Sequence, residues 1–138
     1  MGASRSIFRH FFIVVCAAVA ISIVAISCGG SSSSKSSSSN SVKVSEKEWS
    51  ITVSGTELTK GQGNASVPTG TVTFDVKNDG TVDHEFEIQG NGIDQKTGSI
   101  SPGKSATLKV DLKAGKYEVW CPVSGHKELG MDGFVTAS

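Results

Sequence analysis

Short runs in which apolar and polar residues alternate recur along the chain after about residue 48. The alternation is clearest at Val72, Phe74 and Val76, each of which is followed by a polar residue. A period of two is typical of a β-strand with one face in a core. The same pattern occurs at residues 49–53, 84–88, 106–110 and 117–121, and a last strand is expected around Phe134.

Turn-forming residues separate these runs. Asn78-Asp79-Gly80, Ser101-Pro102-Gly103 and Ala114-Gly115 each follow or precede an alternating run, and such clusters favour turns. No segment of useful length has the period of a helix. The pattern therefore predicts an all-β fold, an antiparallel sandwich or barrel of about seven or eight strands.

The alternation also places two reactive side chains in the interior. His84 has the same parity as Phe86 and Ile88, so all three should lie on one face of their strand. Cys121 has the same parity as the apolar residues Tyr117 and Val119. Both His84 and Cys121 are therefore expected to point inward near strand ends.

Residues 1–27 read as an export signal, with Arg5 and Arg9 before an apolar run at residues 11–27. The run ends in Ala25-Ile26-Ser27-Cys28, which resembles the lipobox of bacterial lipoproteins. This resemblance implies cleavage before Cys28 and lipidation of its thiol. An uncleaved N-terminal anchor is the alternative, because the run is at the lower limit for spanning a bilayer. Either interpretation places the remainder outside the cytoplasm and tethers it to a membrane.

Residues 28–41 are almost all serine after Cys28-Gly29-Gly30. This composition offers no apolar surface to bury, so we expect a disordered linker between the lipidated cysteine and a folded domain at residues 42–138. The domain has ten lysines, no arginine and thirteen acidic residues, a net charge of −3. That charge gives no reason to expect nucleic-acid binding, and the domain is expected to be a monomer.

Outside the N-terminal segment the chain has one cysteine, two histidines and one methionine. A lone cysteine excludes a disulfide framework. Cys121, His126 and Met131 follow one another with four residues between each pair, and His84 lies upstream. One thiolate, two imidazoles and a weak axial thioether form the ligand set of a blue-copper electron-transfer site. Singly, each residue is weak evidence, because an inward histidine or cysteine is more often part of a core.

The domain resembles a cupredoxin, the family of plastocyanin, azurin and rusticyanin. The likeness extends over residues 42–138 and is strongest at residues 72–78, at His84 and from Tyr117 through the loop to Met131. It implies a Greek-key sandwich and one type 1 copper ion bound by His84, Cys121, His126 and Met131. The spacing of the last three ligands is similar to that in the longer-loop members of the family.

The resemblance also implies roles for three neighbours of the ligands. Glu85 follows the first histidine, where plastocyanins and azurins usually have an asparagine that ties the ligand loops together. The N–H groups of Glu85 and Val123 are expected to donate to the thiolate and to raise the reduction potential. Trp120 points to the opposite face from Cys121, and we hypothesise that it serves as an electron path, with simple packing as the alternative.

These expectations define a membrane-tethered carrier of single electrons, not an enzyme, whose partners are redox proteins of a membrane electron-transport chain. Copper oxidases need further histidines for a second copper, and a Cys-His nucleophilic pair would lack an orienting acid. Delivery or storage of copper for an oxidase is the main alternative. A metal-free immunoglobulin-like module is a third, and it would leave the ligand set unexplained.

Overall fold

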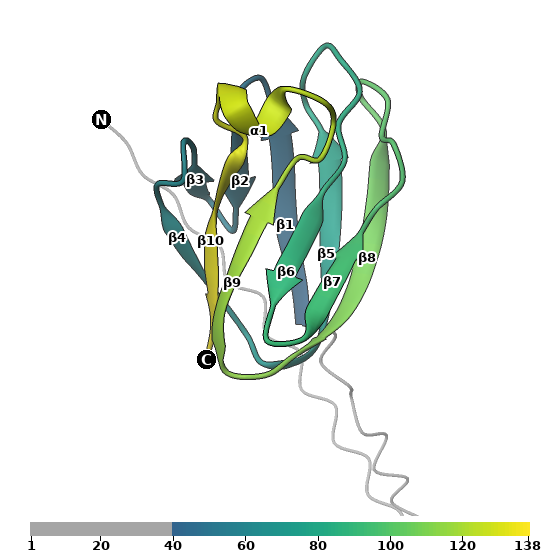
Figure 1. Cartoon of the computed structure of the whole chain (residues 1–138). Helices are drawn as coiled ribbons and strands as arrows, with labels where there is room; N and C mark the ends of the chain where they lie inside the picture. Colours follow the sequence, from purple (N-terminus) through teal and green to yellow (C-terminus); the bar gives the residue numbers. More distant parts are fainter. Residues whose placement is uncertain (1–39) are drawn as a thin grey trace, which may run out of the picture. The chain divides into compact units, whose positions relative to one another are not determined.

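Two five-stranded sheets pack face to face in the computed structural model, which describes residues 40–138 (Figure 1). The predicted signal, the predicted lipidation site Cys28 and most of the expected linker lie outside the described residues. The strands of the first sheet, in spatial order, are β3 (Thr56–Leu58), β2 (Ser50–Val53), β1 (Asn40–Lys47), β5 (Gly70–Asn78) and β8 (Ser105–Leu112). Those of the second are β4 (Asn64–Val67), β10 (Asp132–Ala137), β9 (Gly115–Trp120), β6 (Glu87–Gly90) and β7 (Ile93–Lys96).

The predicted all-β sandwich is confirmed, with two differences in detail. The described residues form ten strands instead of seven or eight, because β1 and the short edge strands β3 and β7 were not expected. Two pairings are parallel, β1 with β5 and β10 with β4, while the others are antiparallel. β1 begins at Asn40, two residues before the expected start of the domain at Val42.

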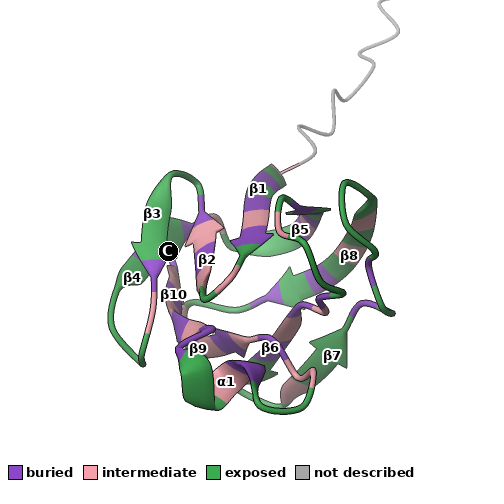
Figure 2. Cartoon of the chain, turned by 90° about the horizontal axis from the view of Figure 1, so that it is seen from above, coloured by how far each residue is buried: buried purple, intermediate pink, exposed green. Residues whose placement is uncertain are grey.

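The interior contains most of the residues that the alternation assigned to it. Phe74 and Phe86, from opposite sheets, pack with their ring centroids 5.3 Å apart. Seen from above, strands of both sheets carry buried segments (Figure 2). In β10 the buried residues are Gly133, Val135 and Ala137, whereas Phe134 lies on the outer side beneath the Lys116 ammonium. Burial of this apolar surface supplies most of the driving force for the sandwich.

One end of the sandwich collects the loops that carry the predicted ligands. The connection from β5 to β6, the turn from β1 to β2, and the short helix α1 (His126–Leu129) meet there (Figure 1). Asn78, at the end of β5, is fully buried, and its side-chain amide donates to Val82 O at 2.7 Å and to Ile100 O at 2.6 Å. Its side-chain oxygen accepts from the N–H of Gly80 at 2.9 Å. Asn78 therefore fixes the path of the chain into His84.

Among the described residues, no helix has the length and apolar character needed to cross a membrane.

Candidate metal centre

The segment from Cys121 to Met131 forms a closed loop between β9 and β10. The N–H of Cys121 donates to Met131 O at 3.0 Å, and the N–H of Met131 donates to His126 O at 3.0 Å. Gly125 precedes α1 with φ of 82°, and Gly130 follows it with φ of 121°, values that favour glycine. Cys121, His126 and Met131 are thus linked by backbone hydrogen bonds.

His84 reaches the same place from the connection between β5 and β6. It forms an isolated bridge with Ile100, in which His84 N donates to Ile100 O at 3.1 Å and Ile100 N donates to His84 O at 2.8 Å. Because Asn78 holds Ile100 O as well, the backbone at His84 is fixed on both sides.

The structure brings His84, Cys121 and His126 together in a buried cluster. Cys121 Sγ lies 3.7 Å from His84 Nδ1 and 3.4 Å from His126 Nδ1, and one candidate ligand atom from each residue lies within 4.8 Å of the other two. Cys121 and His84 are completely buried and His126 is 8% exposed. Met131 is also fully buried, directly beside this cluster in the hydrogen-bonded loop.

This donor set fits one type 1 copper ion. A soft thiolate and two imidazoles, all turned toward a common point from which water is excluded, are the ligands that such a site requires. The buried Met131 in the closed loop would supply the weak thioether. Burial and the neighbouring His126 lower the pKa of His84, although Glu48 opposes this, and a neutral imidazole is the form that binds metal.

The thiol of Cys121 is protonated at neutral pH in the absence of metal. Burial raises its pKa to about 11, while the N–H groups of Glu85 and Val123 act in the opposite direction. The Glu85 N–H lies 3.4 Å from Sγ. Since copper binds the thiolate, binding at neutral pH releases this proton.

Glu46 lies close to the centre and was missed in the sequence. Its side chain is on the inner face of β1, fully buried, and neither carboxyl oxygen has a hydrogen-bond partner. Burial, and secondarily the Glu85 carboxylate, raise the pKa of Glu46 to about 8. Glu46 is therefore mainly uncharged at neutral pH, which removes most of the cost of burying it.

Trp49 has a different place from the one that its parity indicated. It precedes β2, lies at the turn from β1, and its ring meets that of His126 edge-on with centroids 5.1 Å apart. The side chain is 39% exposed, so it covers His126 instead of entering the core with Ile51 and Val53.

Trp120 is half-buried at the end of β9, where the Lys127 ammonium lies 4.3 Å from its ring centroid. Lys127 also pairs with Glu118 at 2.6 Å. This arrangement is compatible with either role considered for Trp120.

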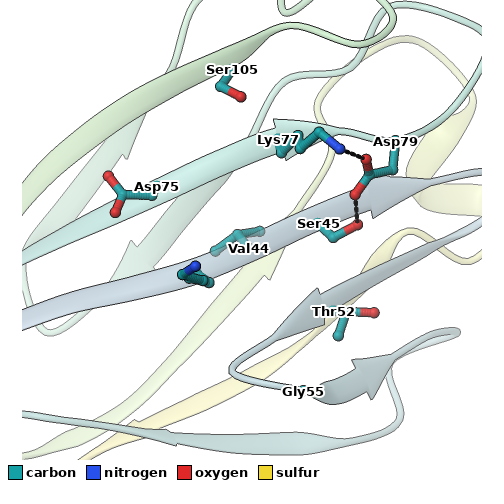
Figure 3. A pocket seen from close by; sticks show the side chains of 9 residues that line it. Val44, Ser45, Thr52, Gly55, Asp75, Lys77, Asp79 and Ser105 are labelled. Atoms are coloured by element: carbon teal, nitrogen blue, oxygen red, sulfur yellow. Dashed lines mark hydrogen bonds and ion pairs between the residues drawn. The ribbon is translucent and has the colours of Figure 1, made fainter.

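Away from the metal centre, a hollow lies on the outward-facing side of β1, β2 and β5 (Figure 3). Both of its carboxylates have partners: Asp79 accepts from Ser45 and pairs with Lys77, and Asp75 accepts from the neighbouring Ser41 (the Ser45 and Lys77 contacts are drawn in Figure 3). The hollow offers no cluster of candidate metal ligands like that at the loop end.

Comparison with known families agrees with the fold and with the cluster. A model of the cupredoxin-like domain family matches residues 18–137. The chain belongs to the cupredoxin-like family. No match was found among curated proteins.

Solved structures share the fold of this cupredoxin at low sequence identity. Reduced auracyanin from the photosynthetic bacterium Roseiflexus castenholzii is 21% identical, with a TM-score of 0.57 over 72% of this chain and 98% of that one. Rusticyanin from Thiobacillus ferrooxidans is 21% identical, with a TM-score of 0.54 over 73% and 79% of the two chains. A multicopper oxidase from Pediococcus acidilactici is 19% identical, with a TM-score of 0.56, and the match covers 74% of this cupredoxin but 27% of the oxidase.

Replacing Glu46 by glutamine should remove a pH dependence of stability. The pKa of Glu46 is raised from 4.5 to about 8 on folding, so the unfolded chain loses this proton at lower pH than the folded one. The free energy of unfolding of the wild type, relative to Glu46→Gln, should therefore fall as the pH rises from 5 to 8, by up to roughly 4 kcal/mol. Denaturant unfolding of the metal-free proteins measures this difference.

Glu57→Gln is the matched control, because Glu57 is an exposed glutamate of the same sheet. Its unfolding curve should follow that of the wild type at each pH. A difference between wild type and Glu46→Gln that stays constant from pH 5 to 9 would show that Glu46 does not keep its proton in the fold.

Proposed function

We propose that this cupredoxin is an extracytoplasmic, lipid-anchored type 1 copper protein that passes single electrons between redox partners. The observation that carries the proposal is the convergence of Cys121, His84 and His126 in one buried cluster. Cys121 would bind copper as a thiolate, the two histidines through Nδ1, and Met131 as the weak axial ligand. When bound, copper supplies one-electron chemistry between Cu(I) and Cu(II).

The contribution of the protein is to hold these four side chains in one arrangement. The loop hydrogen bonds at 3.0 Å and the bridge between His84 and Ile100 fix the backbone at every ligand. A fixed, dry ligand set changes little between the two oxidation states, which keeps the barrier to electron transfer low. The N–H of Glu85 directed at Sγ favours the thiolate in both states.

An electron carrier explains this arrangement better than an enzyme or a copper-delivery protein. Within residues 40–138 both histidines belong to the same cluster, so none remains for a second, catalytic copper. Delivery requires the metal to leave readily. His126, the ligand nearest the surface, is only 8% exposed and lies against Trp49, which favours retention of the metal.

The surface above the cluster suits docking of a redox partner. The large apolar side chains exposed on the described part of the chain are Trp49, Val82 and Leu129, which are 39%, 41% and 48% exposed. Trp49 contacts His126, Leu129 ends the helix that His126 begins, and Val82 lies two residues before His84. We assign these three residues to the docking surface for redox proteins of a membrane electron-transport chain.

Cyclic voltammetry of the copper-loaded full chain tests the carrier function. It should give a reversible one-electron wave that is stable over repeated cycles, because the buried ligands hold both oxidation states. Incubation of the Cu(I) form with a strong copper-accepting protein should remove copper slowly relative to electron transfer. Irreversible waves, or rapid complete transfer of copper to the acceptor, would support delivery instead.

Leu129→Lys should slow electron self-exchange between oxidised and reduced copies by about tenfold or more, because two docking surfaces that carry added like charges repel each other. NMR line broadening measures the exchange rate. Thr107→Lys, which adds the same charge on exposed β8, is the control and should have a small effect. An equal loss of self-exchange rate in Leu129→Lys and Thr107→Lys would contradict the assigned surface.

Trp120→Leu tests the electron path through Trp120. An unchanged self-exchange rate in this variant would favour the packing role of Trp120.

Cys28→Ser should release the protein from the membrane fraction, because one lipid attached to this thiol is proposed to be the anchor. Cys16→Ser, which alters the apolar run but not the lipobox, should leave the protein membrane-bound. Mass spectrometry should detect the lipid on the wild type and on Cys16→Ser, but not on Cys28→Ser. Retention of Cys28→Ser in the membrane would indicate an uncleaved apolar anchor.

A further inference from the structure

The ring nitrogen of His84 that does not face Cys121, Nε2, lies near the carboxylate of Glu48. Nε2 is fully buried and has no hydrogen-bond partner at normal distance. The closest charged group is the Glu48 carboxylate, whose Oε1 lies 3.6 Å away. Since Nδ1 faces Cys121, Nε2 is the nitrogen that carries the proton when Nδ1 binds a metal.

A buried N–H without an acceptor is costly, and a shift of a few tenths of an ångström would bring Glu48 within hydrogen-bond distance. Histidines that bind metals commonly donate their other N–H to a carboxylate or carbonyl, which fixes the ring and makes it a stronger donor to the metal. Glu48 is placed to perform this function.

The carboxylate of Glu48 is itself fixed and charged. Its Oε1 accepts from the N–H of Thr81 at 2.6 Å, from the N–H of Val82 at 3.0 Å and from the Thr81 hydroxyl at 3.3 Å. Donors of this kind favour the charged carboxylate over its protonated form. Gly80 leaves the room for this group, because a Cβ there would lie 2.5 Å from Oε1.

The side chains of Glu48 and Glu85 make different connections near His84. The carboxylate of Glu85 pairs with Lys96 at 2.9 Å. Glu48, by contrast, connects the turn between β1 and β2 to the segment that leads into His84.

We propose that Glu48 is a positioning residue that accepts a hydrogen bond from the Nε2–H group of His84, holds Nδ1 toward the copper, and lowers the reduction potential. The inference rests on the proposed function, since it needs copper bound at Nδ1. A fixed anion close to the site stabilises the more positively charged Cu(II) state more than Cu(I). If Glu48 only braced the loop, its replacement would leave the ratio of the Cu(II) and Cu(I) affinities unchanged.

Glu48→Gln separates these two roles. The glutamine oxygen can still accept from Thr81 and Val82, but the negative charge is gone. The variant should bind Cu(II) about tenfold more weakly than the wild type, with Cu(I) affinity close to unchanged. That ratio corresponds to a reduction potential higher by about 59 mV for a one-electron couple.

The experiment measures the potential by voltammetry and both copper affinities by competition with chelators, on the full chain. Glu85→Gln is the matched control, since it removes a carboxylate of similar exposure that pairs with Lys96, and its potential should change much less. Glu48→Asp keeps the charge but moves it away from His84. Its reduction potential should therefore rise as well, but by less than that of Glu48→Gln. This variant keeps the test available if Glu48→Gln does not fold.

Equal potentials in wild type, Glu48→Gln and Glu48→Asp would overturn the inference, as would an equal shift in Glu85→Gln. The proposed function fails by a different result, namely a wild-type protein that binds Cu(II) without an intense thiolate-to-copper absorption band.

Discussion

The short loop between β9 and β10 is closed at its base by backbone hydrogen bonds, and the copper site depends on this closure. The N–H of Cys121 donates to Met131 O, and that of Met131 donates to His126 O, both at 3.0 Å. Three of the four proposed ligands therefore lie on one closed ring of backbone. His84 is fixed separately by its bridge to Ile100. These backbone hydrogen bonds help to hold the ligands in position, as a carrier with little rearrangement between oxidation states requires.

Three glutamates around this centre have different electrostatic states because their surroundings differ. Glu46 is buried without a partner, which raises its pKa to about 8. Glu85 pairs with Lys96 at 2.9 Å. Glu48 is held by N–H donors that lower its pKa to about 2, and its Oε1 lies 3.6 Å from His84 Nε2. Glu48 is thus the glutamate placed to act on the metal site through a ligand.

The sequence predicted the parts of the fold that follow from local alternation, and it placed His84 and Cys121 correctly on inward faces. It failed where local order and long-range packing disagree. β1 was missed because its third inward residue is Glu46, so the apolar pattern stops after Val44. The edge strand β7 has little apolar alternation to detect. Trp49 continues the parity of Ile51, but the turn before β2 removes it from the sheet.

The role of Glu48 could not be read from the sequence either, because its partners come from a distant segment that only the fold brings near. The shared requirement behind all these features is a Cys121 thiolate bound to copper between two imidazoles. One equivalent of Cu(II) added to the full-length protein tests this directly by absorption and EPR spectroscopy. The wild type should develop an intense visible thiolate-to-copper band that Cys121→Ser lacks. A colourless wild type with bound Cu(II), or a spectrum that survives Cys121→Ser, would contradict the account.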